Sequence, residues 1–384
     1  MLHNLTTEVL TARLTDDRRR QDAFDAFEEE LVAILTGVTT SATPYTVHPA
    51  KAATELRPLD PSASPDPLRP TTLDSMIGQR TLRPLLRRLV DSAKRTGHLD
   101  HMLFVGASGT GKTTVATIVA RELGTRIFSL RAPLDMGVLN QLRESAQDGD
   151  VVFVDEIHLQ VSGDRRGINQ ACDPESFYML LEDGVLSTAT GPLPFPRVTF
   201  IGATTDIGLL PEPLTNRFPL RPQLASYTVE DMMALAKRSL TALNLSYDEA
   251  VIGLFAGASR SNPRQLNDYV KAARSLAGGQ RITGALATEV IVDLSHTTLD
   301  GLTASMQTVL SFLYRHCGRQ TKDGIIYTAS VNTLATAAGH GRDTKAISLL
   351  VEPYLLRRGY LEVRPSGRTL TREGVERAHL LIGG

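Results

Sequence analysis

The feature that most limits how this chain can fold is a glycine-rich run of eight residues, Gly106 to Thr113, which reads GASGTGKT. It follows a short apolar run, residues 102–105, and opens a segment of helical character that ends near Leu123. Such a turn between a strand and a helix lets backbone N–H groups wrap around phosphates, and the helix N-terminus adds a positive dipole. The sequence therefore predicts a nucleotide-binding site at this turn, made by Gly106, Ser108, Gly109, Thr110, Gly111, Lys112, Thr113 and Thr114.

Within this site Lys112 should reach the β- and γ-phosphates, and the hydroxyl of Thr113 should ligate Mg²⁺. A second motif is the apolar run 151–154, which ends in Asp155 and Glu156. Adjacent carboxylates at a strand end repel each other, so a metal ion and an attacking water would explain the pair. We expect Asp155 to hold Mg²⁺ and Glu156 to polarise the water, which predicts ATP hydrolysis rather than binding alone. The alternative is an acidic strand end that only meets solvent.

Three polar side chains near these motifs are further candidates. Thr204 follows the apolar run 198–201, where a hydroxyl could orient the water near the γ-phosphate. Arg217 comes after the last strand and could leave its own subunit. Arg264 lies in the first turn of a helix, where a cation opposes the helix dipole and suggests a nearby anion. For each of the three, a purely structural role is the alternative.

Short apolar runs at residues 102–105, 126–130, 151–154 and 198–201 alternate with helical stretches. This pattern predicts an α/β domain with a parallel sheet flanked by helices. Residues 228–297 read as helix throughout, and the last part of the chain runs helix, helix, helix, strand, turn, strand, which is the order of a winged helix. We therefore expect a large ATPase domain at 69–223, an all-helical lid at 224–297 and a winged-helix DNA-binding domain at 298–384.

The first residues have a different character. Residues 1–37 space their apolar side chains as a helix does, opposite a charged face, which predicts an amphipathic helical extension. It could brace the main body or serve as a handle for a protein partner. Residues 38–68 read as a proline-rich linker, because seven of the 20 prolines lie between residues 38 and 70.

Composition limits the partners and the compartment. The net charge is −1, from 41 basic and 42 acidic residues, so any nucleic-acid surface has to be a local patch. Residues 300–384 carry 11 Lys and Arg against 7 Asp and Glu, which makes this segment the best candidate. Two cysteines exclude a disulfide scaffold and a cysteine zinc site. Because no long apolar run or signal peptide is found, we expect no membrane contact and a cytoplasmic location.

Over residues 69–382 the chain resembles the RuvB family, the AAA+ motors of Holliday-junction branch migration. The matching stretches are Arg69-Pro70, Leu73-Asp74, Ile77-Gly78-Gln79, Gly106–Thr113, Asp155–His158, Ile201–Thr205, Pro213-Leu214, Arg217-Phe218, Pro263-Arg264, Arg342–Thr344, Glu352–Leu355 and Gly359–Leu361. The resemblance implies ATP and Mg²⁺ as cofactors, Ile77 against the adenine, Thr204 as sensor 1 and Arg264 as sensor 2. It also implies that Arg217 is an arginine finger acting in the neighbouring subunit of a hexameric ring around duplex DNA.

The stretch before the strand of Thr204 departs from the family pattern. In the family, a β-hairpin there reaches RuvA, whereas residues 184–200 here form a shorter stretch that carries Pro192, Pro194 and Pro196. Proline cannot donate to a hairpin ladder, so we expect a poor hairpin and doubtful docking to a standard RuvA. The wing offers Arg364 and Arg368 as DNA contacts, with a solvated wing arginine as the alternative.

Three functions remain open at this point. The first is an oligomeric ATPase that moves on, or remodels, duplex or branched DNA, which the family-like wing favours. The second is an AAA+ switch that recruits or remodels a partner protein, which the altered hairpin and the acidic extension favour. The third is a nucleotide-gated DNA-binding regulator with negligible turnover, against which Glu156 argues.

Two further features are expected to have only structural roles. We expect His158 to pack at a helix start and residues 164–167 to form a solvated loop.

Overall fold

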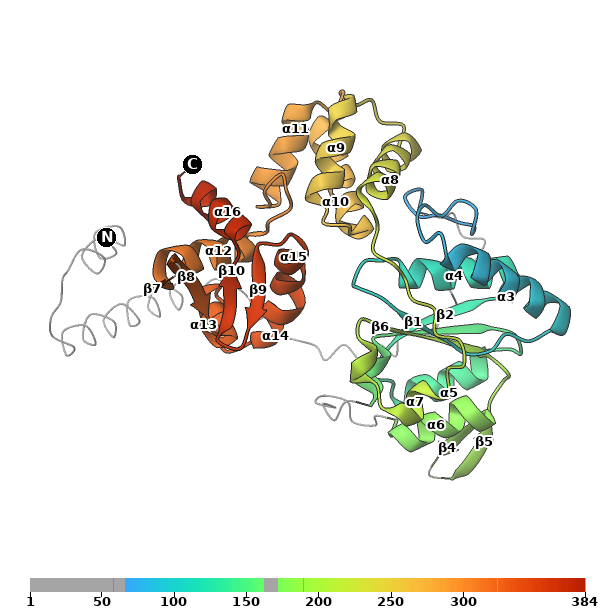
Figure 1. The fold of residues 1–384 in the computed structure, drawn as a ribbon. Coiled ribbons are helices and arrows are strands. Elements are labelled where there is room, and N and C mark those ends of the chain that lie inside the picture. Colours follow the sequence, from blue (N-terminus) through green and yellow to red (C-terminus); the bar gives the residue numbers. More distant parts are fainter. Residues whose placement is uncertain (1–57, 59–65, 162–171, 189, 323, 384) are drawn as a thin grey trace, which may run out of the picture. The chain divides into compact units, whose positions relative to one another are not determined.

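The computed structural model describes Pro58 and residues 66–161, 172–188, 190–322 and 324–383 (Figure 1). The predicted extension 1–37, most of the predicted linker 38–68 and the loop 164–167 lie outside these residues, so those three predictions stay untested. Within the described residues, no helix is both long and apolar enough to cross a membrane.

A four-stranded parallel sheet forms the centre of the ATPase domain. Its strands are β1 (Met102–Val105), β6 (Thr199–Thr204), β3 (Val151–Asp155) and β2 (Ile127–Arg131), in that spatial order. Residues 220–223 extend it beyond β1 through two parallel bridges. The predicted parallel sheet is confirmed, although β6 starts and ends later than the apolar run suggested, so Thr204 is the last residue of the strand.

Helices cover both faces of this sheet, because alternate residues of each strand are apolar and point in opposite directions. Phe104 and Phe153 pack with α3 (Leu82–Thr96) and α4 (Lys112–Leu123). Leu103 and Val152 pack on the other face, with helices α5 (Met136–Ser145), α6 (Pro174–Asp183) and α7 (Glu212–Thr215). The two apolar layers hold the strand ends in place, and the predicted α/β architecture is confirmed (Figure 1).

The expectation of a poor hairpin before β6 is wrong. Strands β4 (Val185–Thr188) and β5 (Gly191–Pro194) pair antiparallel over four residues each. At the base of the hairpin, the backbone N–H of Phe195 donates to the carbonyl of Gly184 at 2.9 Å. Because bonded positions alternate along an antiparallel ladder, Pro192 and Pro194 occupy the positions between them, where an N–H would face outward. Both prolines are exposed, so the ladder loses no donor to them.

The lid is a helical unit with its own apolar core, formed by buried residues between Met232 and Ile291. It consists of α8 (Val229–Ala242), α9 (Glu249–Ala258), α10 (Pro263–Ala277), α11 (Gly284–Glu289) and the π-helical turn η4 (Val290–Leu294). Thr228 and Asp231 form the capping box that starts α8. Asn262 caps α10 by accepting hydrogen bonds from the backbone N–H groups of Arg264 and Gln265.

The predicted winged helix is present and has more strands than the sequence indicated. Its sheet has the order β7-β8-β10-β9, with β7 (Gly318–Thr321), β8 (Gly324–Ala329), β9 (Leu361–Arg364) and β10 (Gly367–Leu370). The sequence prediction missed β7, β8 and the last helix, α16. Strand β7 is polar and largely exposed and so lacks an alternating pattern. The helices are α12 (Ala304–His316), α13 (Val331–Ala337), the continuous run α14–η5–α15 (Thr344–Ala346, Ile347–Val351, Glu352–Arg357) and α16 (Arg372–Gly383).

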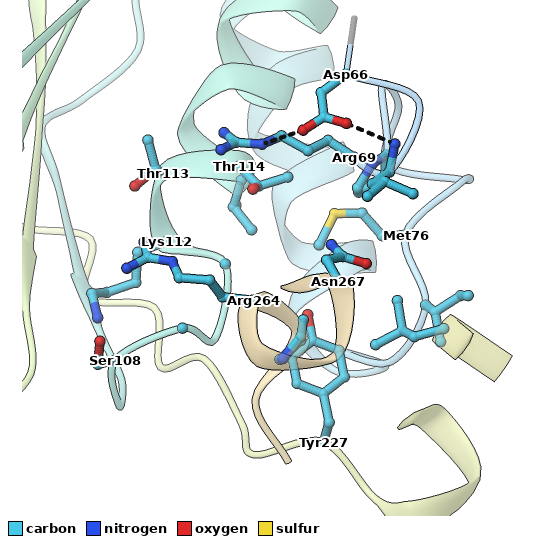
Figure 2. Close-up of a pocket in the computed structure, with 18 of the residues that line it drawn as sticks. Asp66, Arg69, Met76, Ser108, Lys112, Thr113, Thr114, Tyr227, Arg264 and Asn267 are labelled. Atoms are coloured by element: carbon cyan, nitrogen blue, oxygen red, sulfur yellow. Dashed lines mark hydrogen bonds and ion pairs between the residues drawn. The ribbon is translucent and has the colours of Figure 1, made fainter. Parts of the chain in front are cut away.

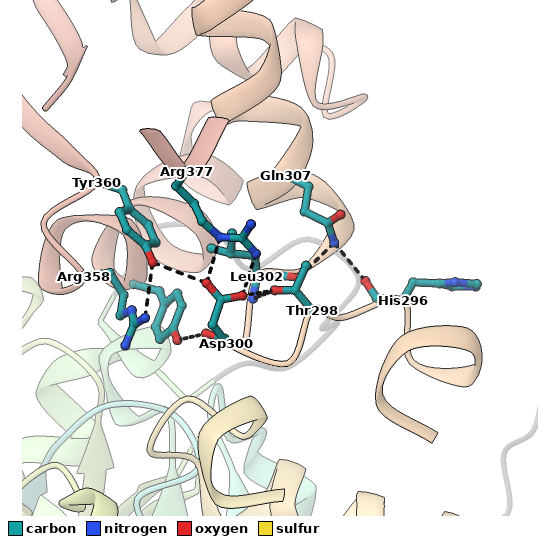
Figure 3. A network of polar contacts seen from close by, with 9 residues as sticks. His296, Thr298, Asp300, Leu302, Gln307, Arg358, Tyr360 and Arg377 are labelled. Atoms are coloured by element: carbon teal, nitrogen blue, oxygen red, sulfur yellow. Dashed lines mark hydrogen bonds and ion pairs between the residues drawn. The ribbon is translucent and has the colours of Figure 1, made fainter. Parts of the chain in front are cut away.

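A polar network anchors the segment that leads into this domain (Figure 3). The carboxylate of Asp300 accepts hydrogen bonds from Arg377 at 2.8 and 2.9 Å and from the hydroxyl of Thr298 at 2.5 Å. The Tyr354 hydroxyl donates to the backbone carbonyl of Asp300 at 2.5 Å, and Tyr360 lies 3.3 Å from its carboxylate. Burial opposes ionisation of Asp300, but the hydrogen bonds from Arg377 and Thr298 outweigh it and lower the pKa of this carboxyl group. The network therefore ties the start of the domain to α15 and α16.

Both wing arginines form ion pairs with glutamates of their own domain. Arg368 makes a two-pronged ion pair with Glu352, at 2.6 Å from Nε and 3.0 Å from Nη2, and the Glu352 side chain is only 6% exposed. Arg364 pairs with the exposed side chain of Glu362 at 2.5 Å. The DNA contact expected of Arg368 stays a prediction, and in this structure a carboxylate of its own domain already occupies its guanidinium.

Replacing Arg368 with alanine should therefore destabilise the winged helix, since it leaves the buried carboxylate of Glu352 without its partner. We expect the free energy of unfolding to fall by about 1.5–3 kcal/mol, the cost of losing hydrogen bonds to a charged group. Urea unfolding of the full chain measures it. Arg364→Ala is the matched control and should cost about 1 kcal/mol or less, because its pair is exposed to water. Equal losses in the two variants would contradict the structural role of Arg368.

Candidate active site

A cavity of about 470 Å³ lies at the carboxyl ends of the central strands (Figure 2). The glycine-rich loop and the start of α4 line one side, and the two acids at the end of β3 lie beside them. Ile77 and the first turn of α10, with Arg264, complete the wall. The structure thus brings most of the predicted nucleotide-site residues around one space.

The loop owes its shape to glycines at two positions. Gly109 and Gly111 have φ angles of 80° and 98°, in the left-handed region that side chains rarely adopt. A Cβ atom on Gly109 would lie 2.1 Å from the side-chain oxygen of Asn262, so the lid could not approach a larger residue. Thr110 closes the loop internally, because its hydroxyl donates to the carbonyl of Ala107 at 2.8 Å.

Lys112 lies folded against the loop itself. Its ammonium group donates to the carbonyl oxygens of Gly106 at 2.7 Å and Ala107 at 3.1 Å. Burial lowers the pKa of Lys112, and the nearby carboxylates of Glu156 and Asp155 only partly offset that effect. A buried cation held by two neutral carbonyls has room for a stronger acceptor, and phosphate oxygens in the loop would be such an acceptor.

The two acids at the end of β3 differ in how they are held. The Oδ1 atom of Asp155 accepts a hydrogen bond from the backbone N–H of Glu156 at 3.1 Å. Glu156 itself has a φ of 50° and a ψ of 45°, a left-handed conformation that is strained for a residue with a side chain. Its Oε2 atom is buried and receives no hydrogen bond. A strained residue with an unsatisfied buried oxygen is typical of a functional site, since the fold gains nothing by it.

The donor set suits Mg²⁺ held together with a nucleotide. Thr113 and Asp155 both line the cavity and offer hard oxygen ligands. Among the described residues, no group of three or more His, Cys, Asp or Glu side chains could hold a metal ion. A magnesium ion at this place would therefore take its remaining ligands from phosphate and water, as it commonly does.

Thr204 and His158 form a second layer behind the acids. Thr204 is fully buried at the end of β6, and its hydroxyl lies 3.3 Å from Nδ1 of His158. The same nitrogen lies 3.4 Å from Oε2 of Glu156. Sequence reasoning treated His158 as a packing residue, and its place two residues after Glu156 was the only signal of this contact.

Arg217, by contrast, lies outside the residues that line the cavity. Its guanidinium donates to the carbonyl oxygens of Tyr178 at 3.2 Å and Pro213 at 2.6 Å. It also pairs with the carboxylate of Glu182 at 2.5 Å and lies 4.7 Å from the centre of the Tyr178 ring. Of the five predicted catalytic residues, Lys112, Asp155 and Glu156 line the cavity, and Thr204 lies behind Glu156 with His158 between them. Arg217 is held instead by residues of α6 and α7.

Comparison with known proteins agrees with this geometry. The family model for the Holliday junction DNA helicase RuvB P-loop domain matches residues 68–224, and that for the RuvB C-terminal winged helix domain matches residues 300–379. A Holliday junction branch migration complex subunit RuvB from Kosmotoga olearia is 33% identical over 320 residues, which cover 80% of this chain and 88% of that protein. The protein of the same name from Synechococcus sp. is 34% identical over 348 residues, 86% of this chain and 92% of that protein.

A solved structure gives the same answer for the fold. The Thermotoga maritima RuvB Holliday junction branch migration motor matches with a TM-score of 0.67 and 29% identity, over 82% of this chain and 99% of that one. The glycine-rich loop and the acids of β3 fall within the P-loop family model, and the Glu352–Arg368 pair falls within the winged-helix model. This chain therefore belongs to the RuvB family of AAA+ P-loop ATPases.

Proposed function

We propose that this protein is an ATP-driven DNA motor of the RuvB type, which acts in the cytoplasm on duplex or branched DNA. The observation that carries the proposal is the union in one chain of an ATPase site and a winged helix, both matched by RuvB family models. The relatives named Holliday junction branch migration complex subunit RuvB support a branched DNA substrate.

In this proposal the side chains around the cavity divide the work of hydrolysis. Lys112 turns from its loop carbonyls to the β- and γ-phosphates, and Arg264 contacts the γ-phosphate from the lid. Thr113 and Asp155 hold Mg²⁺, which when bound neutralises the charge that develops on the phosphates. Glu156 orients the attacking water, and the hydroxyl of Thr204, at the end of β6, supports that orientation from behind Glu156. Ile77 packs against the base.

We further propose that the active form is a homo-oligomeric ring, probed below through Arg217. Within one chain Arg217 does not line the cavity, and its guanidinium is held by Glu182 and by backbone carbonyls. A role in hydrolysis therefore requires the nucleotide of a neighbouring subunit. A hexamer around DNA is the arrangement that the family resemblance implies. The formed hairpin β4–β5 removes the proline argument against a RuvA-like partner there, although the stretch stays shorter than in the family. Residues 1–37 offer a second place for a protein partner.

Two observations favour a second candidate function, an AAA+ switch that remodels a protein partner. The wing arginines are paired with glutamates of their own domain. On the helix that precedes the wing, Leu349 and Leu350 are 64% and 67% exposed, which suits a protein surface better than a phosphate backbone. DNA contacts in the first candidate would instead come from exposed cations such as Arg342 and Lys345, at the start of the same helix.

The nucleotide chemistry can be tested with two variants that fail in different ways. Lys112→Ala should weaken ATP binding about 10- to 100-fold, because it removes charge-assisted hydrogen bonds to the phosphates. Glu156→Gln should bind ATP normally and hydrolyse it about 10²- to 10⁴-fold more slowly, the usual contribution of a general base. Calorimetric titration and phosphate release measure the two steps. Normal turnover by Glu156→Gln would exclude Glu156 as the group that activates the water.

The shared site can be tested by mixing variants. Arg217→Ala should lose about 10³- to 10⁵-fold in rate if it acts as an arginine finger. Mixing it with inactive Lys112→Ala should restore part of the activity, because some interfaces then combine an intact loop with an intact arginine. The control mixture pairs Arg217→Ala with the double variant Lys112→Ala/Arg217→Ala and should stay inactive. No rescue in rings shown by native mass spectrometry to be mixed would contradict a shared site.

DNA dependence separates the two candidate functions. ATP hydrolysis should rise with duplex and four-way DNA, and duplex affinity should fall steeply with salt. Arg342→Ala/Lys345→Ala should reduce the salt slope by about two phosphate contacts, whereas Arg364→Ala, whose guanidinium is paired with Glu362, should change it less. The protein-remodelling switch would become the favoured function if no DNA changed the rate of ATP hydrolysis and Arg342→Ala/Lys345→Ala left the duplex affinity unchanged.

A further inference from the structure

The short helix that follows the two acids is held firmly against the sheet. This helix, η2 (Ile157–Gln160), begins directly after Glu156. Ile157 packs where Gly202 of β6 has no side chain, since a Cβ there would lie 2.8 Å from the Ile157 Cδ1 atom. At the other end, the buried Gln160 amide accepts from the N–H of Leu134 at 2.7 Å and donates to the carbonyl of Cys172 at 2.9 Å. His158 is therefore carried on a rigid support.

From this support the His158 ring reaches Thr204, and the hydroxyl of Thr204 decides which partner donates. That hydroxyl donates its one proton to the backbone carbonyl of Asp206 at 3.0 Å and accepts from the N–H of Asp206 at 3.2 Å. We assign that proton to the shorter of the two contacts, the carbonyl of Asp206, which leaves the hydroxyl to accept from the imidazole, 3.3 Å away. This assignment places the hydrogen on Nδ1 of His158.

The same nitrogen lies near the carboxylate of Glu156. Oε2 of Glu156 lies 3.4 Å from Nδ1 and receives no hydrogen bond of its own. Because the backbone of Glu156 is in the strained left-handed region, neighbouring contacts have to keep the residue in place. The nitrogen of His158 is the cationic or N–H group that the structure places beside that oxygen.

We propose that His158 is a positioning residue that links the sensor Thr204 to the base Glu156, so that the two side chains are set together. Nδ1 of His158 lies within 3.4 Å of both oxygens. A displacement of either oxygen would therefore move the imidazole relative to the other. His158 does not line the cavity, so it acts through Glu156 and Thr204 and not on the nucleotide. The inference rests on the roles proposed above for these two residues.

A packing role alone does not explain why Nδ1 of His158 lies so near to both Thr204 and Glu156. The His158 side chain is 16% exposed and could be replaced by an apolar ring if shape alone mattered. Its nitrogen instead meets two oxygens from two different strand ends, β3 and β6, whose relative position is fixed by their pairing. The contact therefore reports on the alignment of the base with the sensor.

The test compares His158→Phe, which keeps the ring and loses the N–H, with His158→Asn, whose amide nitrogen can take the place of Nδ1. His158→Phe should lower kcat about 10- to 100-fold, the effect expected when a reacting group is misplaced by about 1 Å. The KM for ATP and calorimetric ATP affinity should stay within about 2-fold of the unchanged protein. His158→Asn should recover most of the loss, and wild-type kcat in His158→Phe would overturn the proposal.

A double-variant cycle with Thr204→Val tests the link itself. If His158 and Thr204 act as one unit, His158→Phe/Thr204→Val should be about as slow as the slower single variant, whereas independent roles would multiply the two losses. Multiplied losses would overturn the link.

If His158→Phe folds poorly, His158→Gln can replace it. Its donor lies nearer the Nε2 position than the Nδ1 position, so the same slow turnover is expected. Glu156→Gln keeps the two ideas apart: its normal turnover would refute the proposed function, while its inactivity beside a normal His158→Phe refutes only the positioning role.

Discussion

The site depends on one constraint, the parallel pairing of β1, β6 and β3. In this register Val105 lies opposite Thr204, and Val154 lies opposite Gly202. Parallel strands end at the same edge of the sheet. Strand pairing alone therefore brings together the glycine-rich loop after β1, the acids at the end of β3 and Thr204 at the end of β6. The two apolar layers on either face of the sheet hold that edge still. The site thus follows from strand order, because its residues lie at the ends of these strands or in the segments that directly follow them.

The lid meets this edge at points where side chains are small or precisely paired. Asn262 lies over Gly109, and the hydroxyl of Tyr227 donates to the carbonyl of Thr110 at 3.3 Å. The amide of Gln79 forms two hydrogen bonds with the backbone of Ala225, at 2.8 and 3.0 Å, in the segment that leads to the lid. A nucleotide in the loop would therefore touch elements of both units at once. These contacts place the lid directly against the loop that we propose binds the phosphates.

Much of this was predictable, because the decisive signals are local. The glycine-rich run, the acids after an apolar strand and the helix start that carries Arg264 each occupy a few consecutive residues, and the structure places residues of each around the cavity. Contacts between distant side chains were not predictable. Arg368 is paired with Glu352, 16 residues away, and no pattern in the wing reveals which cation has a carboxylate beneath it. His158 was missed for the same reason, since its partner Thr204 is brought by strand pairing. The hairpin β4–β5 was misjudged because counting prolines ignores which N–H groups face outward.

In the proposed function the cavity binds the phosphates of ATP through Lys112 and orients water through Glu156. A crystal structure of Glu156→Gln with ATP and Mg²⁺ would show both contacts. We expect the Lys112 ammonium to leave the carbonyl oxygens of Gly106 and Ala107 and to donate to the β- and γ-phosphates, with the loop N–H groups around them. A nucleotide bound elsewhere, or a Lys112 still held by the two carbonyls with ATP present, would contradict it.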